Sequence, residues 1–219
     1  MLIIGLTGAI ASGKSTVSRT MNEKFGITVI DADLIAKEVV LPGKKAYRKI
    51  VAAFGNQVDD LVNPETHQLN REALGRAVFG NPANLRILNG IVHPAVKWEI
   101  ARQIVMAFFT LKRLVVLDVP LLFEAGLHSI CGSIVTTSCS PETQLERLLA
   151  RNPELTKEDA QKRIARQASP KERNLRADYV LDNDGNVEKL QESIETFLEE
   201  INPGWFWTFL NFIPGVMIL

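Results

Sequence analysis

The chain lacks several features that mark particular classes of protein. Among its 219 residues are only two cysteines, Cys131 and Cys139, with no histidine pair at zinc-ligand spacing, so neither a zinc site nor a disulfide framework is indicated. The 25 basic and 25 acidic residues balance, which gives no indication of a nucleic-acid groove or of a polybasic membrane surface. We expect buried free thiols in a reducing compartment, and therefore a cytoplasmic protein that binds no nucleic acid.

Other absences narrow the architecture and the function. The first apolar run has no basic segment before it, so no cleavable secretory signal is expected, and no internal repeat or low-complexity tract occurs. No N-K-x-D tetrapeptide is present to read guanine, which counts against a GTPase switch. The length suits one α/β domain with insertions.

The segment Gly8-Ala9-Ile10-Ala11-Ser12-Gly13-Lys14-Ser15 matches the phosphate-binding pattern G-x-x-x-x-G-K-[ST] in full. It lies between an apolar run, Met1–Leu6, and an amphipathic helical pattern, Lys14–Phe25, which is the strand–turn–helix context that the motif requires. The loop's N–H groups and the positive end of the helix would hold phosphate oxygens. Lys14 is expected to reach the β- and γ-phosphates, and the Ser15 hydroxyl to bind Mg²⁺.

Acidic residues follow two other predicted strands. Ile27–Ile30 leads into Asp31-Ala32-Asp33 and then into a helical pattern, Leu34–Val40, so these acids are candidates for chemistry at the carboxyl edge of a parallel sheet. The alternative is that Asp33 only caps the helix. The apolar strand Leu114–Asp118 ends in an acid that suits a second contact to Mg²⁺ or its waters. The loop Pro120–Glu124 follows and should turn Glu124 toward the same cleft.

Residues 44–111 are predicted to form a helical insertion that could be one wall of a substrate pocket. Four helices are expected, and His93 precedes a proline at the start of the last one, where it would serve in packing, capping or function. Their ranges are Ala46–Phe54, Asn70–Phe79, Pro82–Asn89 and Pro94–Leu111.

The last third of the chain combines two strands with helices that are rich in arginine. The strands are Ser133–Ser138 and Asp178–Leu181, Thr156-x-x-Asp159 is a capping box, and Asn186–Ile201 is a closing helix. Arginine suits bidentate clamping of phosphates, so a phosphate lid is favoured over the alternative of solvated helix faces. The arginines concerned are Arg147, Arg151, Arg163, Arg166, Arg173 and Arg176.

From residue 2 to about 200 the chain resembles the dephospho-coenzyme A kinase family. The resemblance lies in Gly5–Ser15, Asp31–Asp33, His93-Pro94, Pro120–Glu124 and Arg163–Gln167, which occur in the family's order. It implies an α/β phosphate-loop NTPase of three layers, similar to nucleoside monophosphate kinases, with a five-stranded parallel sheet in the order 2-3-1-4-5. It also implies a core at 1–40, 112–145 and 177–202, a helical CoA-binding domain at 41–111 and a lid at 146–176.

The same resemblance implies transfer of the γ-phosphate of ATP to the ribose 3′-hydroxyl of dephospho-CoA, with Mg²⁺, in the last step of CoA synthesis. Alternatives are a nucleoside monophosphate kinase and an ATP-binding adaptor without turnover, and a monomer is favoured. The expected catalytic residues are Asp33, Lys14 and Arg151, and the expected metal contacts are Ser15 and Asp118. The expected ATP site is Gly8 to Ser15 with Arg147 and Arg151, and the acceptor site is Asp31, Asp33, His93, Leu122, Glu124 and Arg163.

The segment Trp205–Leu219 is apolar and carries no charge. As a helix it would rise about 22 Å, short of the roughly 30 Å hydrocarbon core of a bilayer, and Pro214-Gly215 would interrupt it. Three alternatives remain, which are peripheral membrane contact, docking onto the domain and packing against a partner. Trp205 and Trp207 suit a membrane interface, so peripheral contact is favoured.

Overall fold

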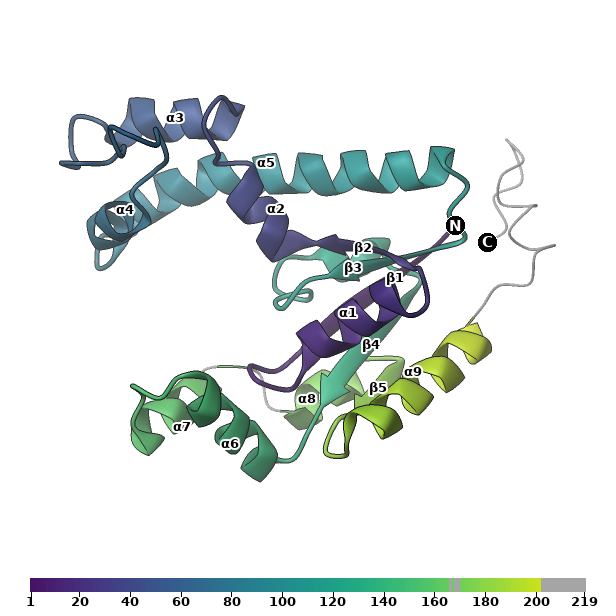
Figure 1. The fold of residues 1–219 in the computed structure, drawn as a ribbon. Coiled ribbons are helices and arrows are strands. Elements are labelled where there is room, and N and C mark those ends of the chain that lie inside the picture. The colour runs from purple at the N-terminus through teal and green to yellow at the C-terminus, as the bar shows by residue number, and fades with distance from the viewer. Residues whose placement is uncertain (166, 168–169, 202–219) are drawn as a thin grey trace. The chain divides into compact units, whose positions relative to one another are not determined.

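The computed structural model describes residues 1–165, 167 and 170–201. The chain divides into two compact units, one made of Met1–Ile30 and the chain from Ala107 onward, and the other made of Asp31–Met106. Figure 1 labels the helices and strands of both.

A five-stranded sheet forms the centre of the first unit. Its strands are β1 (Leu2–Gly8), β2 (Thr28–Asp31), β3 (Leu114–Asp118), β4 (Ser133–Ser138) and β5 (Tyr179–Asp182), in the order β2-β3-β1-β4-β5. The order inferred from the family resemblance is therefore confirmed. Strand β1 pairs in parallel with β3 and β4, with Leu6 opposite Asp118 and Thr7 opposite Thr136. Because the strands are parallel, the segments that follow them emerge at one edge, where ligands of open α/β sheets bind.

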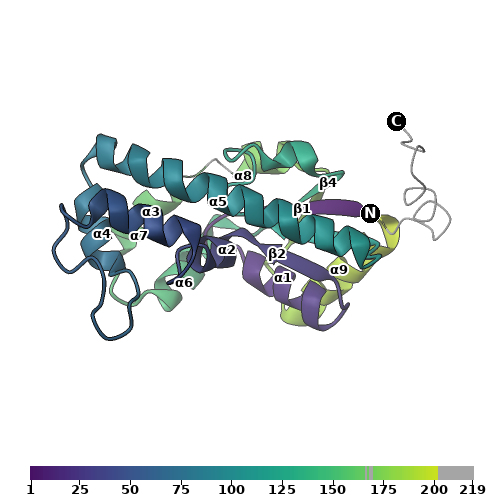
Figure 2. The same ribbon diagram turned by 90° about the horizontal axis from the view of Figure 1, so that it is seen from above.

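The two faces of β1 are covered differently. Ile4 and Leu6 are fully buried in a cluster with residues of α1 (Lys14–Glu23) and α9 (Val187–Ile201). Helices α1 and α9 lie side by side on this face in Figures 1 and 2. On the other face, a Cβ added to Gly5 would lie 2.6 Å from Cδ2 of Leu122. Close packing on both faces holds the carboxyl end of β1, and hence the phosphate loop, in a fixed place.

Beyond β3 the first unit contains a 3₁₀ turn and three short helices. These are η1 (Leu127–Ile130), α6 (Pro141–Arg151), α7 (Lys157–Ala165) and α8 (Pro170–Leu175). The Ser140 hydroxyl accepts the N–H of Thr143 and caps α6. The Thr156 hydroxyl accepts the N–H of Asp159, which is one of the two bonds of the predicted capping box, and it donates to the Asp159 carboxylate at 2.8 Å. Arg166 lies outside the described residues.

The second unit is helical, as predicted. It contains α2 (Ala32–Glu38), α3 (Lys45–Phe54), α4 (Arg71–Val78) and most of α5 (Pro82–Phe109). Ile50, Phe54 and Leu74 are buried in its core, against which Leu88, Ile91 and Val92 of α5 pack.

The prediction of two helices around Pro94 is wrong, because α5 runs without a break from Pro82 to Phe109. Proline removes one backbone hydrogen bond and crowds the carbonyl four residues before it, which for Pro94 is that of Gly90. Ile91 and Val92 before Pro94 pack into the helical core, and Ile100 after it is 1% exposed. Packing on both sides therefore outweighs the local preference. His93 consequently lies inside a helix, exposed, and not at a helix start.

Within the described ranges, no helix combines the length and the apolarity needed to cross a membrane. The predicted apolar segment Trp205–Leu219 lies outside these ranges.

Candidate active site

The phosphate loop connects the buried end of β1 to α1, and two of its residues adopt the left-handed conformation. These are Ala11, with φ of 59°, and Gly13, with φ of 91°. A Cβ on Gly13 would lie 1.9 Å from Nδ2 of Asn183, which donates to the Ser12 carbonyl at 2.8 Å. Both the backbone angle and the neighbouring amide therefore require glycine at position 13.

For several N–H groups of the loop, no acceptor is recorded among the described residues. In the part of the chain that the structure describes, none is recorded for the amides of Ala11, Gly13, Lys14 and Ser15, and α1 has no side-chain cap. A helix begins with orphan N–H donors and a partial positive charge. This arrangement is suited to the oxygens of a phosphate group.

Lys14 is held at the sheet edge by an ion pair. Its Nζ donates to Oδ1 of Asp118, the last residue of β3, whose side chain is 3% exposed. The pair places a cation directly after the loop and a carboxylate beside it. The Ser15 hydroxyl has no recorded partner among the described residues, and Ser15 is exposed.

Ser15 and Asp118 fit a magnesium ion that would arrive with a nucleotide. Across the described residues, no group of three or more His, Cys, Asp or Glu side chains could hold a metal by itself. Magnesium usually takes one or two protein ligands and completes its shell with phosphate oxygens and water. Ser15 and Asp118 match that limited protein contribution.

Arg147 of α6 also approaches the loop. Its Nη1 is buried, has no hydrogen-bond partner within residues 1–165, 167 and 170–201, and lies 3.9 Å from the position that a Cβ on Gly13 would take. Nearby, hydrogen bonds from the backbone and side chain of Ser140, with smaller effects that include the charge of Arg147, lower the pKa of Asp184. The buried Nη1 of Arg147 and the N–H groups of the loop, for which no acceptor is recorded among the described residues, together indicate an anion-binding site.

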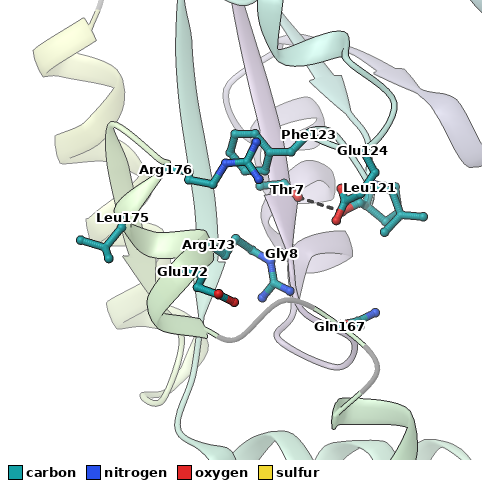
Figure 3. Close-up of a pocket in the computed structure, with 11 residues that line it drawn as sticks. Thr7, Gly8, Leu121, Phe123, Glu124, Gln167, Glu172, Arg173, Leu175 and Arg176 are labelled. Atoms are coloured by element: carbon teal, nitrogen blue, oxygen red, sulfur yellow. Dashed lines mark hydrogen bonds between the residues drawn. The ribbon is translucent and has the colours of Figure 1, made fainter.

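A cavity of about 670 Å³ opens beside the loop (Figure 3). The Arg176 guanidinium stacks 3.9 Å above the Phe123 ring, and the Thr7 hydroxyl donates to the Pro120 carbonyl at 2.9 Å. Glu124 lines the cavity, and its predicted role at the acceptor site stays a prediction. The complete lining is Thr7, Gly8, Pro120, Leu121, Phe123, Glu124, Gln167, Glu172, Arg173, Leu175 and Arg176.

Arg173 gives this cavity a buried cationic wall. Arg173 is 8% exposed. Burial lowers the pKa of its guanidinium, and the charge of Glu124 opposes that shift. Leu122, predicted to line the acceptor site, does not line this cavity, because its side chain is fully buried against Gly5. The neighbouring Leu121 and Phe123 line it instead.

Asp31 and Asp33 belong to the helical unit and have different environments. Asp31 accepts the N–H groups of Asp33 at 2.8 Å and Leu34 at 2.9 Å, so it is the residue that caps α2. The alternative in which Asp33 is the cap is therefore wrong. Asp33 is exposed, and no hydrogen bond to its carboxylate is recorded among the described residues.

For two arginines predicted to close on phosphates, no hydrogen bond to the loop is recorded among the described residues. Arg151, at the end of α6, and Arg163, on α7, are exposed, with no ion pair recorded for either in the described chain. Their predicted roles stay predictions. Sequence reasoning missed Gln144, Gln167 and Asn183, whose side-chain amides bond the loop's backbone. Gln167 ends the segment Arg163–Gln167 on which the family resemblance rests, but that pattern did not indicate this contact. An amide that bonds a peptide group leaves no characteristic spacing.

Comparisons with known proteins agree with this geometry. A family model described as dephospho-CoA kinase matches residues 2–189. The chain is 47% identical over 214 residues to the Saccharomyces cerevisiae protein named dephospho-CoA kinase CAB5, covering 98% of this chain and 88% of that protein. It is 46% identical over 201 residues to a Bacillus cereus dephospho-CoA kinase, covering 92% of this chain and 98% of that one.

Solved structures match as well. That of the dephospho-CoA kinase from Campylobacter jejuni has a TM-score of 0.69 at 26% identity, covering 91% of this chain and 96% of that one. The phosphate loop, the sheet order and the family match over nearly the whole chain lead to one conclusion. The chain belongs to the dephospho-CoA kinase family.

Proposed function

We propose that this chain transfers the γ-phosphoryl group of ATP to the ribose 3′-hydroxyl of dephospho-CoA and releases CoA and ADP. The observation that supports this most is the cavity that begins at Thr7 and Gly8, where β1 runs into the phosphate loop. An acceptor held there would have its hydroxyl near the transferred phosphate. Stacked Phe123 and Arg176, with buried Arg173, offer flat and cationic surfaces to a nucleotide acceptor.

In the reaction, the 3′-oxygen forms a bond to the γ-phosphorus while the bond from that phosphorus to the β–γ bridging oxygen breaks. The hydroxyl proton must pass to a base, and we assign this role to Asp33. This residue follows the end of β2 by two positions, and β2 ends at the same sheet edge as β1. The cap made by Asp31 fixes the first turn of the helix that carries Asp33. Asp31 thereby acts on the acceptor site through Asp33.

When bound with ATP, Mg²⁺ would neutralise charge on the β- and γ-oxygens. We assign the protein contacts of this ion to the Ser15 hydroxyl and Asp118. The loop's free N–H groups and Lys14 would hold the same phosphates. Arg147, whose Nη1 is buried without a partner, would bind a phosphate oxygen, and Arg151 would join it from the end of α6.

The three-part organisation is also a proposal. Residues 41–111 would bind the acceptor, with His93 as a contact, and residues 146–176 would form a lid that carries Arg163. The helical core of α3, α4 and α5 supports the first assignment, and the arginines of α6, α7 and α8 support the second.

Identification of the product tests the function. Incubated with γ-labelled ATP, Mg²⁺ and dephospho-CoA, the protein should place the label on a product that co-migrates with CoA and carries it at the ribose 3′ position. Label in ADP after addition of AMP, with none in CoA, would favour a nucleoside monophosphate kinase. Binding of ATP without label transfer to either acceptor would favour the adaptor.

We further propose that a cytoplasmic form of this protein contacts a membrane surface through Trp205–Leu219. In the first unit, Phe109 is 73% and Leu111 is 68% exposed, and Lys112 and Arg113 follow them. The Leu2 N–H donates to the Arg113 carbonyl, and Leu2 packs against the same core cluster as Ile201, the last described residue before that segment. Apolar side chains beside cations suit an anionic lipid interface.

Truncation after Gly204 tests this proposal. The shortened protein should keep its kinase activity and should lose co-sedimentation with anionic vesicles. Loss of folding or activity would instead indicate that the segment docks onto the domain. Unchanged sedimentation would show that the segment does not bind lipid.

A further inference from the structure

Two glutamine side chains bond the backbone of one residue of the phosphate loop, Ile10, one from helix α6 and the other from the segment between α7 and α8. Gln144 of α6 donates through Nε2 to the Ile10 carbonyl at 2.8 Å, and Gln167 accepts the Ile10 N–H through Oε1 at 2.9 Å. Figure 3 shows Gln167 among the residues that line the cavity. The orientations of both amides follow from their partners, because a carbonyl needs a donor and an N–H needs an acceptor.

These bonds leave Ile10 with no backbone group for a phosphate. Its N–H and C=O are both satisfied, whereas the amides of Ala11, Gly13 and Lys14 have no acceptor within the described ranges. The Ile10 N–H is therefore not a donor for the anion site, and because the Ile10 carbonyl points to Gln144, the Ala11 N–H of the same trans peptide unit points the opposite way. Ala11 directly follows and has φ of 59°, a conformation that costs a non-glycine residue of the order of 1 kcal/mol and that needs support from its surroundings.

The two glutamines differ in position. Gln144 is 3% exposed and does not line the cavity, whereas Gln167 is half-buried and does line it. Gln167 lies between α7 and α8, and its own N–H donates to the Ile164 carbonyl of α7 at 3.1 Å. Gln167 belongs to residues 146–176, which carry the arginines proposed for the lid and are called here the arginine-bearing segment. A side chain of this segment therefore helps to hold the phosphate loop.

We propose that Gln144 and Gln167 are positioning residues that clamp the backbone of Ile10, one on its C=O and one on its N–H, and keep the loop in its phosphate-binding conformation before ATP arrives. Gln167 thereby links the arginine-bearing segment to nucleotide affinity. The proposal rests on the proposed function only in taking a nucleotide phosphate as the ligand of the loop, and neither glutamine is assigned a contact with ATP. Without the clamp, nucleotide binding must also order the loop, which weakens affinity.

The test measures ADP affinity by calorimetry, with no acceptor present, in Gln144→Leu and Gln167→Leu. Gln161→Leu is the matched control, because Gln161 is exposed on α7 and no bond of its side chain is recorded among the described residues. Both clamp variants should bind ADP about 3- to 10-fold more weakly, the effect of one lost hydrogen bond. The control should match the parent protein. In steady state, KM for ATP should rise in both clamp variants by more than kcat falls.

Three results would overturn the clamp. One is ADP affinity in both variants within twofold of the Gln161→Leu control. Another is weakening in Gln167→Leu alone with Gln144→Leu folded and unchanged, which would mean a direct effect of Gln167 in the cavity. The third is a fall in kcat with KM for ATP unchanged. Since Gln167 is half-buried, its variant tests the proposal even if Gln144→Leu does not fold. Failure of the parent protein to phosphorylate dephospho-CoA would overturn the proposed function but not the clamp, because ADP binding needs no acceptor.

Discussion

Lys14, which begins the helix after the phosphate loop, forms an ion pair with Asp118, the residue that ends β3. The lysine thus has a carboxylate partner and is kept at the edge of the sheet where we propose that phosphates bind. Lys14→Met keeps most of the side-chain volume but removes the charge, so turnover should fall at least about 10²-fold. Steady-state kinetics with ATP and dephospho-CoA would measure this, and near-parental turnover would show that the loop is misassigned.

Gly13→Ala should damage nucleotide binding more than a left-handed backbone alone explains. The added methyl group would meet the Asn183 amide at 1.9 Å. Gly43→Ala is the matched control, because Gly43 has φ of 86° and no atom lies within 4 Å of its added Cβ. Both variants should lose about 1–2 kcal/mol of stability from the backbone angle. Only Gly13→Ala should also lose ADP binding, as calorimetry would detect. Equal ADP affinities in the two variants would contradict the structure of the loop.

Asp33→Asn should lower kcat by roughly 10²–10⁴ with little change in ATP affinity, since a base assists proton transfer and does not hold the nucleotide. Asp31→Ala is the comparison, because it removes the cap of α2 and should cost about 1 kcal/mol of stability. Thermal denaturation of both variants separates the two roles. An unchanged kcat in Asp33→Asn would remove Asp33 from the mechanism.

The two arginines of α6 should affect different kinetic constants. Arg147, with its buried Nη1 beside Gly13, should raise KM for ATP when changed to alanine. Arg151 is exposed. If it closes on the transferred phosphate, Arg151→Ala should lower kcat. Arg86→Ala, an exposed change on α5, is the control. If Arg151→Ala alters only stability, that arginine belongs to a solvated helix face.

The stability of the first unit should fall in acid partly through Asp184. Hydrogen bonds from Ser140 lower the pKa of this carboxyl in the folded protein. Its contribution is therefore present above the ordinary pKa of an aspartate and is lost as the pH falls through the lower folded-state pKa. Denaturation curves of Asp184→Asn should depend less on pH below about pH 4 than those of the parent protein. An identical pH dependence would contradict this role.

Patterns with a local cause were predictable from the sequence. The phosphate loop, the buried strand Leu114–Asp118 and the capping box at Thr156 each follow from residues near one another in the chain. The break at Pro94 was wrongly predicted because α5 is stabilised by packing on both sides of the proline. The clamp on Ile10 joins residues separated by 134 and 157 positions, and no local pattern encodes such contacts. The assignment of Asp31 as the cap needed the backbone geometry, since either aspartate suits a helix start.

The ratio of kcat/KM for dephospho-CoA to that for AMP, both at saturating ATP and Mg²⁺, tests the proposed function most directly. If the cavity lined by Phe123, Glu124 and Arg173 binds the acceptor, as we propose, this ratio should favour dephospho-CoA by roughly 10²-fold or more. A ratio of one or below would contradict the assignment and would place the chain's activity with the nucleoside monophosphate kinases.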